Sequence, residues 1–117
     1  MITSIAFTVY PVSDMMRSRT FYEKVLGLAA GETFGNKWAE YDVGGSTFAL
    51  TTTDMGHPPG AKGAVVAFEV EDLDAFVKAL KEQSVAFVTD VFETPVCRMT
   101  VIEDPDGNHI TIHKRHA

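Results

Sequence analysis

An internal repeat constrains the fold more than any other feature of the chain. A strand pattern, a helix pattern and three further strand patterns are followed by a non-periodic stretch, and the same order then returns. Residues 6–9 (Ala-Phe-Thr-Val) and 67–70 (Ala-Phe-Glu-Val) hold the same place in the two halves. Each half alone would expose a sheet face that it cannot bury. The repeat predicts an α+β fold of two βαβββ modules in tandem, with curved mixed sheets closing around a cavity.

The length of 117 residues predicts a single domain over 1–117. Module one is expected over 1–53 and module two over 64–117. The linker between them, 54–63, is rich in Gly and Pro and has neither helical nor strand periodicity. Pairing of the modules within one chain and pairing by exchange between two chains both stay open.

Charge and cysteine content narrow the class of protein. The formal net charge is -6 without a basic cluster, which disfavours nucleic acid and anionic membranes as partners. The single Cys97 excludes an intrachain disulfide. Residues 1–10 show strand alternation in place of a signal peptide, and no apolar run reaches membrane length. We therefore expect a cytoplasmic domain.

Turn and cap signals set the expected elements of module one. Alternation predicts a strand over 3–10, and Ser13 or Asp14 is expected to cap a helix that runs to Leu26. A weak strand over 28–35 precedes strands over 37–43 and 46–53. The glycines at 44 and 45 predict a hairpin that pairs Val43 with Ser46.

Module two repeats this plan. We expect a strand over 65–70, a helix capped by Asp72, and strands over 85–92, 97–103 and 108–114. Residues 104–107 (Asp-Pro-Asp-Gly) are turn chemistry. Pairing Glu103 with Asn108 across this turn would place Arg98 opposite His113.

Strand parity then assigns one polar face to the two sheets, and its predicted members are Ser4, Ala6, Thr8, Trp38, Glu40, Thr47, Thr51, Val65, Glu69, Arg98, Thr100, His109, Thr111 and His113. An indole, a guanidinium, imidazoles and carboxylates suit a flat, partly polar organic ligand. The candidate ligand-binding residues are Trp38, Glu40, Glu69, Arg98, His109, Thr111 and His113. No catalytic residue is predicted, because the chain has no nucleophile elbow and no Gly-rich phosphate loop.

Several of these residues have a purely structural alternative. Arg98 either binds the ligand or pairs with Glu40 or Glu69 across the barrel. His109 either contacts the ligand or is solvated or held by Glu69, and His113 either contacts it or lies at an exposed rim. Trp38 lines the cavity or serves the core or a dimer contact.

The chain resembles the vicinal oxygen chelate superfamily, which includes glyoxalases, bleomycin resistance proteins and dioxygenases. The carriers of the resemblance are Val12-Ser13-Asp14, residues 17–28 (RSRTFYEKVLGL), residues 68–72 with the following helix, and residues 103–108 (EDPDGN) with the terminal strand. The resemblance implies paired βαβββ modules, a homodimer, and a cavity that in enzymatic members holds a divalent metal.

The positions that the resemblance implies for metal ligands carry unsuitable side chains. They are Ser4 or Phe7, Ala49, Val65 and Thr111. A lone Thr hydroxyl binds a divalent ion weakly, and the others offer no ligand that such sites use. We therefore expect no cofactor, with a metal site relocated to Glu40, Glu69, His109 and His113 as the alternative.

Two functions follow from these expectations. The leading one is a metal-free small-molecule-binding protein of the bleomycin-resistance type that sequesters an antibiotic or an aromatic metabolite. The alternative is a glyoxalase-like lyase or dioxygenase-type enzyme that uses the relocated metal or general acid/base chemistry.

Overall fold

Two four-stranded mixed sheets, each accompanied by a helix, repeat one arrangement along the chain. The computed structural model describes residues 1, 3–53, 58–60 and 63–117. Contacts divide the chain into two compact units, Met1–Gly60 and Ala61–Ala117. The predicted α+β class and the two βαβββ modules are confirmed. The predicted closure around a cavity stays a prediction, as do the module bounds, and the predicted linker falls largely outside the described residues.

Sheet A, in the first unit, has the strand order β1-β4-β3-β2. Its elements are β1 (Thr8–Pro11), α1 (Met15–Thr20), η1 (Phe21–Val25), β2 (Thr33–Phe34), β3 (Trp38–Val43) and β4 (Ser46–Thr51). Asp14 caps α1 by accepting from the Arg17 backbone N–H at 3.1 Å, as its residue type predicts. The helix continues as one π-helical segment, and Gly27 follows with a φ of 80°.

The apolar core of the first unit lies between this helix and sheet A. Tyr22 and Tyr41 are fully buried, and both rings pack on Phe48 of β4. Tyr10 of β1 meets the same ring edge-on, with 5.4 Å between the centroids. These aromatic contacts define the helix-covered face of sheet A, so the opposite face presents the alternate residues of each strand.

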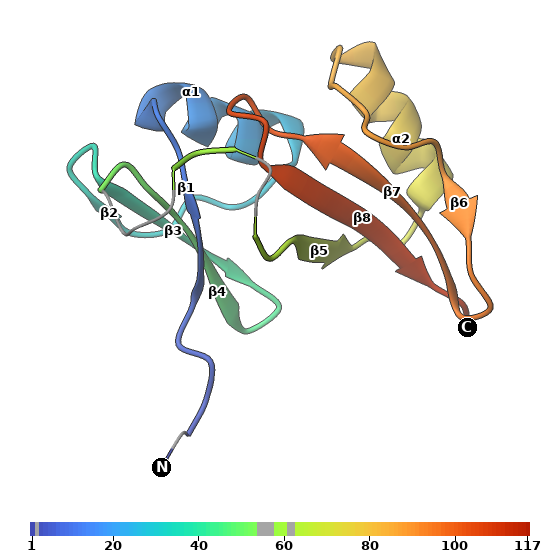
Figure 1. Cartoon of the computed structure of the whole chain (residues 1–117), viewed down its shortest axis with the longest axis horizontal. Helices are drawn as coiled ribbons and strands as arrows, with labels where there is room; N and C mark the ends of the chain where they lie inside the picture. The colour runs from blue at the N-terminus through green and yellow to red at the C-terminus, as the bar shows by residue number, and fades with distance from the viewer. Residues whose placement is uncertain (2, 54–57, 61–62) are drawn as a thin grey trace. The chain divides into compact units, whose positions relative to one another are not determined.

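Sheet B, in the second unit, has the strand order β5-β8-β7-β6. Its elements are β5 (Val66–Glu69), α2 (Leu73–Glu82), β6 (Phe92–Glu93), β7 (Cys97–Glu103) and β8 (His109–Arg115). Asp72 caps α2 through the Ala75 backbone N–H. Figure 1 shows α2 beside the long β7–β8 hairpin, and the fully buried isoleucines at 102, 110 and 112 form the core of this unit. The predicted strand over 85–92 was wrong, since Phe87 makes one isolated bridge and only β6 is a strand there.

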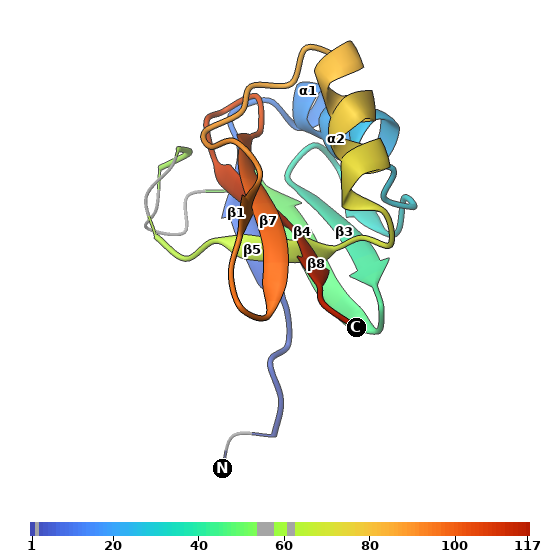
Figure 2. The ribbon, with the colours of Figure 1, turned by 90° about the vertical axis from the view of Figure 1, so that its right-hand side faces the viewer.

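The first predicted strand is shorter than its alternation suggested. Residues 3–7 are exposed and lie outside β1, which begins at Thr8. Thr8 pairs in parallel with Phe48, and β4 begins two residues earlier at Ser46, so no strand remains beside the residues before Ala6. Figures 1 and 2 both show this N-terminal segment extending away from sheet A.

The predicted weak strand over 28–35 is present only as β2, and the residues just before β2 are hydrogen-bonded to β3. Gly31 donates to the Glu40 carbonyl at 3.1 Å, and Glu40 donates to the Glu32 carbonyl at 2.9 Å. A Cβ at Gly31 would lie 2.5 Å from the Glu40 carbonyl oxygen, so glycine is required where this segment crosses β3.

Hairpin registers decide which side chains share a face, and one of the two predictions was correct. The β3–β4 register agrees at every pair, from Val43 with Ser46 to Trp38 with Thr51. The β7–β8 register was wrong by one residue, because Glu103 pairs with His109. Asp104 and Asn108 face each other as the last pair, with 2.9 Å between the Asp104 nitrogen and the Asn108 oxygen, and leave a three-residue loop.

This shift moves the even-numbered residues of β7 to the other face. Arg98 pairs with Lys114 and not with His113, and Thr100 pairs with the fully buried Ile112. Both were predicted on the polar face. In sheet A, Thr8 pairs with Phe48 on the helix-covered face, so its predicted placement was also wrong.

Candidate functional site

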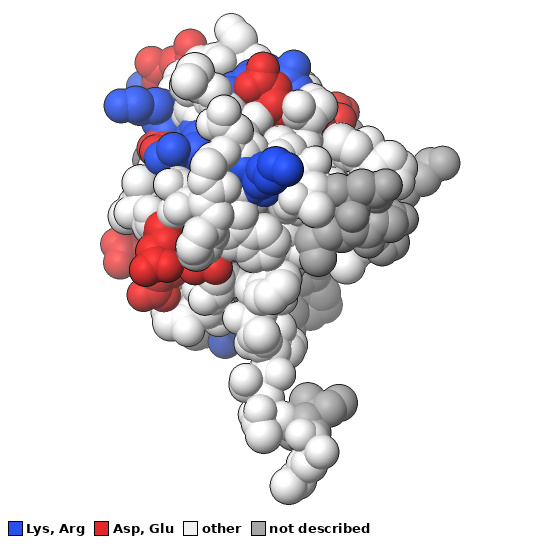
Figure 3. Space-filling view, turned by 90° about the vertical axis from the view of Figure 1, so that its left-hand side faces the viewer, with Lys and Arg blue, Asp and Glu red and all other residues white. Residues whose placement is uncertain are grey.

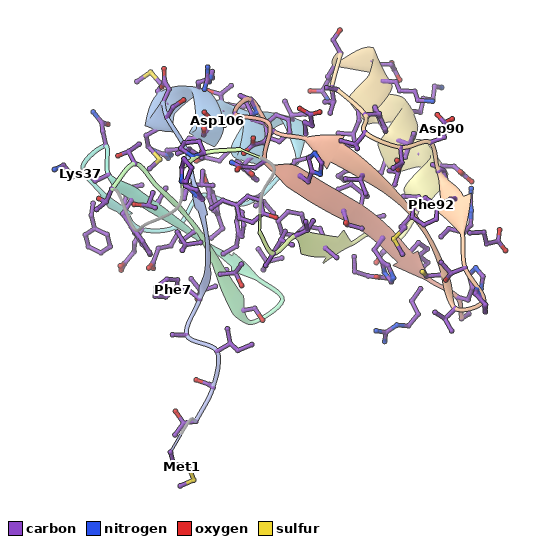
Figure 4. The ribbon with its side chains drawn as sticks, viewed as in Figure 1. Met1, Phe7, Lys37, Asp90, Phe92 and Asp106 are labelled. Atoms are coloured by element: carbon purple, nitrogen blue, oxygen red, sulfur yellow. The ribbon has the colours of Figure 1, made fainter. Side chains whose placement is uncertain are left out.

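An aromatic cluster lies on the face of sheet A opposite the helix, and we call Phe7, Trp38 and Glu40 the sheet A platform. The ring of Phe7 meets Trp38 edge-on at 88°, with 5.2 Å between the centroids. The indole Nε1 of Trp38 donates to Oε2 of Glu40 at 2.9 Å. Figure 4 shows Phe7 where the N-terminal segment joins sheet A. The predicted neighbours Trp38 and Glu40 are therefore in direct contact.

The two aromatic rings remain partly open to solvent. Phe7 is 41% exposed and Trp38 is partly buried. Phe34 of β2 pairs directly with Trp38, so its exposed ring lies on the same face in the neighbouring strand. Sequence reasoning missed Phe7 and Phe34. Side-chain alternation along the first strand placed Phe7 among the helix-facing residues. The weak strand that contains Phe34 was predicted without a partner strand.

The floor beneath the platform is apolar and small. Ala49 of β4 pairs with Glu40 on one side and with Val9 on the other, and it is fully buried. A methyl group at this point offers no ligand to a metal and no donor to a substrate.

The second polar group lies in sheet B, on the face opposite α2, and comprises Glu69, His109, Thr111 and His113. Glu69 pairs with His113 across β5 and β8, and Nδ1 of His113 lies 2.5 Å from Oε1 of Glu69. The other oxygen of Glu69 accepts from the backbone N–H of Arg115 at 2.8 Å. This backbone bond and the His113 ring hold the pKa of Glu69 below its usual range.

His109 and Thr111 share that face by register. Thr111 pairs with Ala67 on β5 and Val101 on β7, and His109 pairs with Glu103. One side-chain oxygen of Glu69 contacts His113, and the other accepts from the backbone of Arg115. These contacts do not support the predicted alternative in which Glu69 holds His109. Sequence parity thus identified the sheet B residues that come from β5 and β8.

Arg98 lies on the helix side of sheet B. Its guanidinium makes two hydrogen bonds to the carboxylate of Asp74 on α2, at 3.0 and 3.3 Å. The predicted partners were Glu40 and Glu69, so that prediction was wrong. The hydrogen bonds from Arg98 lower the pKa of Asp74. Arg98 of β7 therefore links this strand to α2.

The positions that the sequence resemblance implies for metal ligands can now be placed. Ala49 is buried in sheet A, Thr111 lies in β8, and Val65 and Phe7 are exposed and apolar. Within the described ranges, no group of three or more His, Cys, Asp or Glu side chains could hold a metal ion. The described residues also contain no helix that is long and apolar enough to span a bilayer.

Two repeated units with the strand order first-fourth-third-second define a protein built from paired βαβββ modules. A family model described as the Glyoxalase/Bleomycin resistance protein/Dioxygenase superfamily matches residues 4–112. The chain therefore belongs to this superfamily. A comparison with curated proteins found no match.

Solved structures with the same fold include binding and resistance proteins. TnmS3, an antibiotic binding protein from Streptomyces sp. CB03234, is 26% identical with a TM-score of 0.82, and the alignment covers 98% of each chain. A virulence protein from Salmonella typhimurium is 25% identical with a TM-score of 0.76, over 97% of this chain and 98% of that one. FosX, a fosfomycin resistance protein from Listeria monocytogenes, is 14% identical with a TM-score of 0.77, over 97% and 94%, and shows the fold alone.

Proposed function

We propose that this chain binds a small aromatic molecule on the sheet A platform and sequesters it without a metal and without chemical conversion. The observation that carries the proposal is the contact of the partly exposed Trp38 with Phe7 and Glu40, on the face of sheet A opposite its helix. Two partly exposed rings at right angles offer stacking surface, and the carboxylate beside them favours a cationic ring. TnmS3, with the same fold, is an antibiotic binding protein.

The proposal includes no metal because of the side chains that stand at the implied ligand positions. Of the ligand positions that the resemblance implies, two hold the apolar side chains of Ala49 and Val65, and the first holds Ser4 or Phe7. None supplies the imidazole or carboxylate that divalent ions need in such sites. Glu69, His109, Thr111 and His113 belong to the second unit and stay predicted ligand-binding residues of that unit.

Calorimetric titration with two matched probes tests the proposal. N-methylquinolinium is a flat aromatic cation, and quinoline is its neutral counterpart at neutral pH. We expect saturable binding of the cation and weaker binding of quinoline. Trp38→Ala should abolish both. Glu40→Gln should weaken binding of the cation by about tenfold, or roughly 1.4 kcal/mol, because it removes the coulombic attraction of the carboxylate, and should leave quinoline unchanged. Equal affinity of wild type and Trp38→Ala would sink the proposal.

We further propose that the chain works as a homodimer whose two copies meet through residues 3–6 of the N-terminal segment. Residues 1–13 contain no Asp, Glu, Lys or Arg in a chain of net charge -6. Figure 3 shows the protruding end of the molecule without either charge colour. Ile5 is 87% exposed, and an unpaired extended segment with apolar side chains is suited to strand addition.

A further inference from the structure

A pocket in the second unit lies at the end of β8, outside the sheet A platform. Its volume is about 490 Å³, and its lining residues are Pro95, Val96, His113, Arg115, His116 and Ala117. The β6–β7 turn forms one wall and the C-terminal segment forms the other. The backbone N–H of His116 donates to the Val96 carbonyl at 2.9 Å, so the two walls are fastened together.

The guanidinium of Arg115 distinguishes this pocket from the rest of the surface. The chain has four arginines. Arg17 donates to Ser13, Arg19 to Glu23 and Arg98 to Asp74. Among the described residues, no side chain accepts from the guanidinium of Arg115, whose backbone N–H alone is engaged, by Glu69. An unpaired planar fork of donors in a pocket matches the geometry of a carboxylate.

The two acidic side chains near the pocket contact other groups, so the guanidinium of Arg115 is available to bind a ligand. Glu69 accepts from His113, and Glu93 lies 3.9 Å from Nε2 of His116. Glu69 and Glu93 therefore each face an imidazole of the lining. Pro95 and the exposed Val96 add apolar surface at the wall formed by the β6–β7 turn. The pocket thus pairs one cationic fork with an apolar wall.

We propose that this pocket is a second binding site, for a small organic carboxylate whose anionic group sits on Arg115 and whose apolar body lies on Pro95 and Val96. The site is contained in the second unit and does not depend on the sheet A platform. It takes ligands of the opposite charge to those proposed for Trp38 and Glu40, so the two sites can be tested separately.

An NMR titration of the full chain with benzoate tests the site, and benzamide serves as the neutral isostere. We expect saturable amide shift changes at Val96, His113, Arg115 and His116 with benzoate, and about tenfold weaker binding of benzamide. Arg115→Gln should weaken benzoate by about tenfold. Lys114→Gln is the matched control, because it removes the same charge from the adjacent residue, which faces the α2 side of β8. It should leave benzoate affinity unchanged.

Two results would overturn the site. One is equal benzoate affinity of wild type and Arg115→Gln, including no saturable binding by either. The other is loss of benzoate binding in Trp38→Ala with retention in Arg115→Gln, which would place the probe on the sheet A platform. Benzoate binding that survives Trp38→Ala and needs Arg115 supports the pocket, whatever the result with N-methylquinolinium.

Discussion

Phe7 and Trp38 meet edge-to-face, with ring centroids 5.2 Å apart. This contact joins the N-terminal segment to β3 and forms one wall of the sheet A platform. Aromatic pairs of this geometry contribute about 0.5–1.5 kcal/mol beyond area burial. Part of that energy holds the indole in the orientation in which Nε1 reaches Glu40.

Removal of the Phe7 ring should weaken ligand binding without unfolding the protein. Phe7→Ala leaves the indole with fewer fixed neighbours, and we expect the dissociation constant for N-methylquinolinium to rise about fivefold, or roughly 1 kcal/mol. Phe92→Ala is the matched control, since Phe92 is 42% exposed in the other unit and Phe7 is 41% exposed. Calorimetric titration measures the dissociation constant of each variant. An equal loss in the two variants would mean that Phe7 has no specific role.

The Arg98–Asp74 ion pair should matter for stability and not for binding. Arg98→Gln removes the bonds to α2, and the partly exposed pair contributes little because water screens it. We expect a small drop in melting temperature that about 1 M NaCl largely removes, since the Debye length is then about 3 Å. Ligand affinity should stay at the wild-type value, and a marked loss of affinity would return Arg98 to the ligand site.

The Glu23 carboxylate should make the stability of the protein depend on pH. It accepts from Arg19 at 2.7 Å and from the Tyr41 hydroxyl at 2.9 Å. Burial alone would raise the pKa of Glu23, but these two donors bring it below its usual range. Burial and the same carboxylate raise the pKa of Tyr41.

Because the pKa of Glu23 is lower in the folded state, its contribution is complete above the ordinary carboxyl pKa of about 4.3 and is lost as pH falls through the lowered value. Glu23→Gln should therefore cost about 1 kcal/mol at neutral pH and flatten the acid limb of stability against pH. Urea unfolding of both proteins across that window measures the difference. Parallel acid limbs would show that Glu23 does not titrate with folding.

The homodimer should dissociate when its proposed contact is charged. Ile5→Asp places a carboxylate in each uncharged N-terminal segment, and like charges at a two-fold contact repel. We expect light scattering to report the dimer mass for wild type and the monomer mass for Ile5→Asp. Met16→Asp is the control, because Met16 is another exposed apolar residue, on α1. A wild-type protein that is already monomeric, or a dimer unaffected by Ile5→Asp, contradicts the N-terminal contact.

Local chemistry made part of the fold predictable from the sequence. The adjacent glycines 44 and 45 fix a two-residue hairpin, so every pair of β3 and β4 follows, including Trp38 beside Glu40 on one face. Asp72 was identified as a helix cap, and Asp14 was one of two candidates beside Ser13, because a short polar side chain satisfies free backbone N–H groups.

The rest depended on contacts that a turn motif does not encode. The Asp104 carboxylate accepts from the backbone of Asp106 and Asn108 and from the Asn108 amide. These bonds shorten the loop to residues 105–107 and move Arg98 to the α2 side. Phe7 was misplaced because the whole first strand was assigned to the wrong face: Thr8 pairs with Phe48 on the helix-covered face, so alternation puts Phe7 on the opposite face.

Calorimetric titration of N-methylquinolinium into wild-type protein that was purified without a histidine tag and then exhaustively treated with EDTA tests metal-free binding most directly. Elemental analysis of the same sample confirms that the metal has been removed. We predict saturable binding with the same affinity before and after added Zn²⁺, Mn²⁺ or Mg²⁺, and its loss in Trp38→Ala. Binding that appears only when one of these ions is restored would contradict the account and direct attention to a metal site.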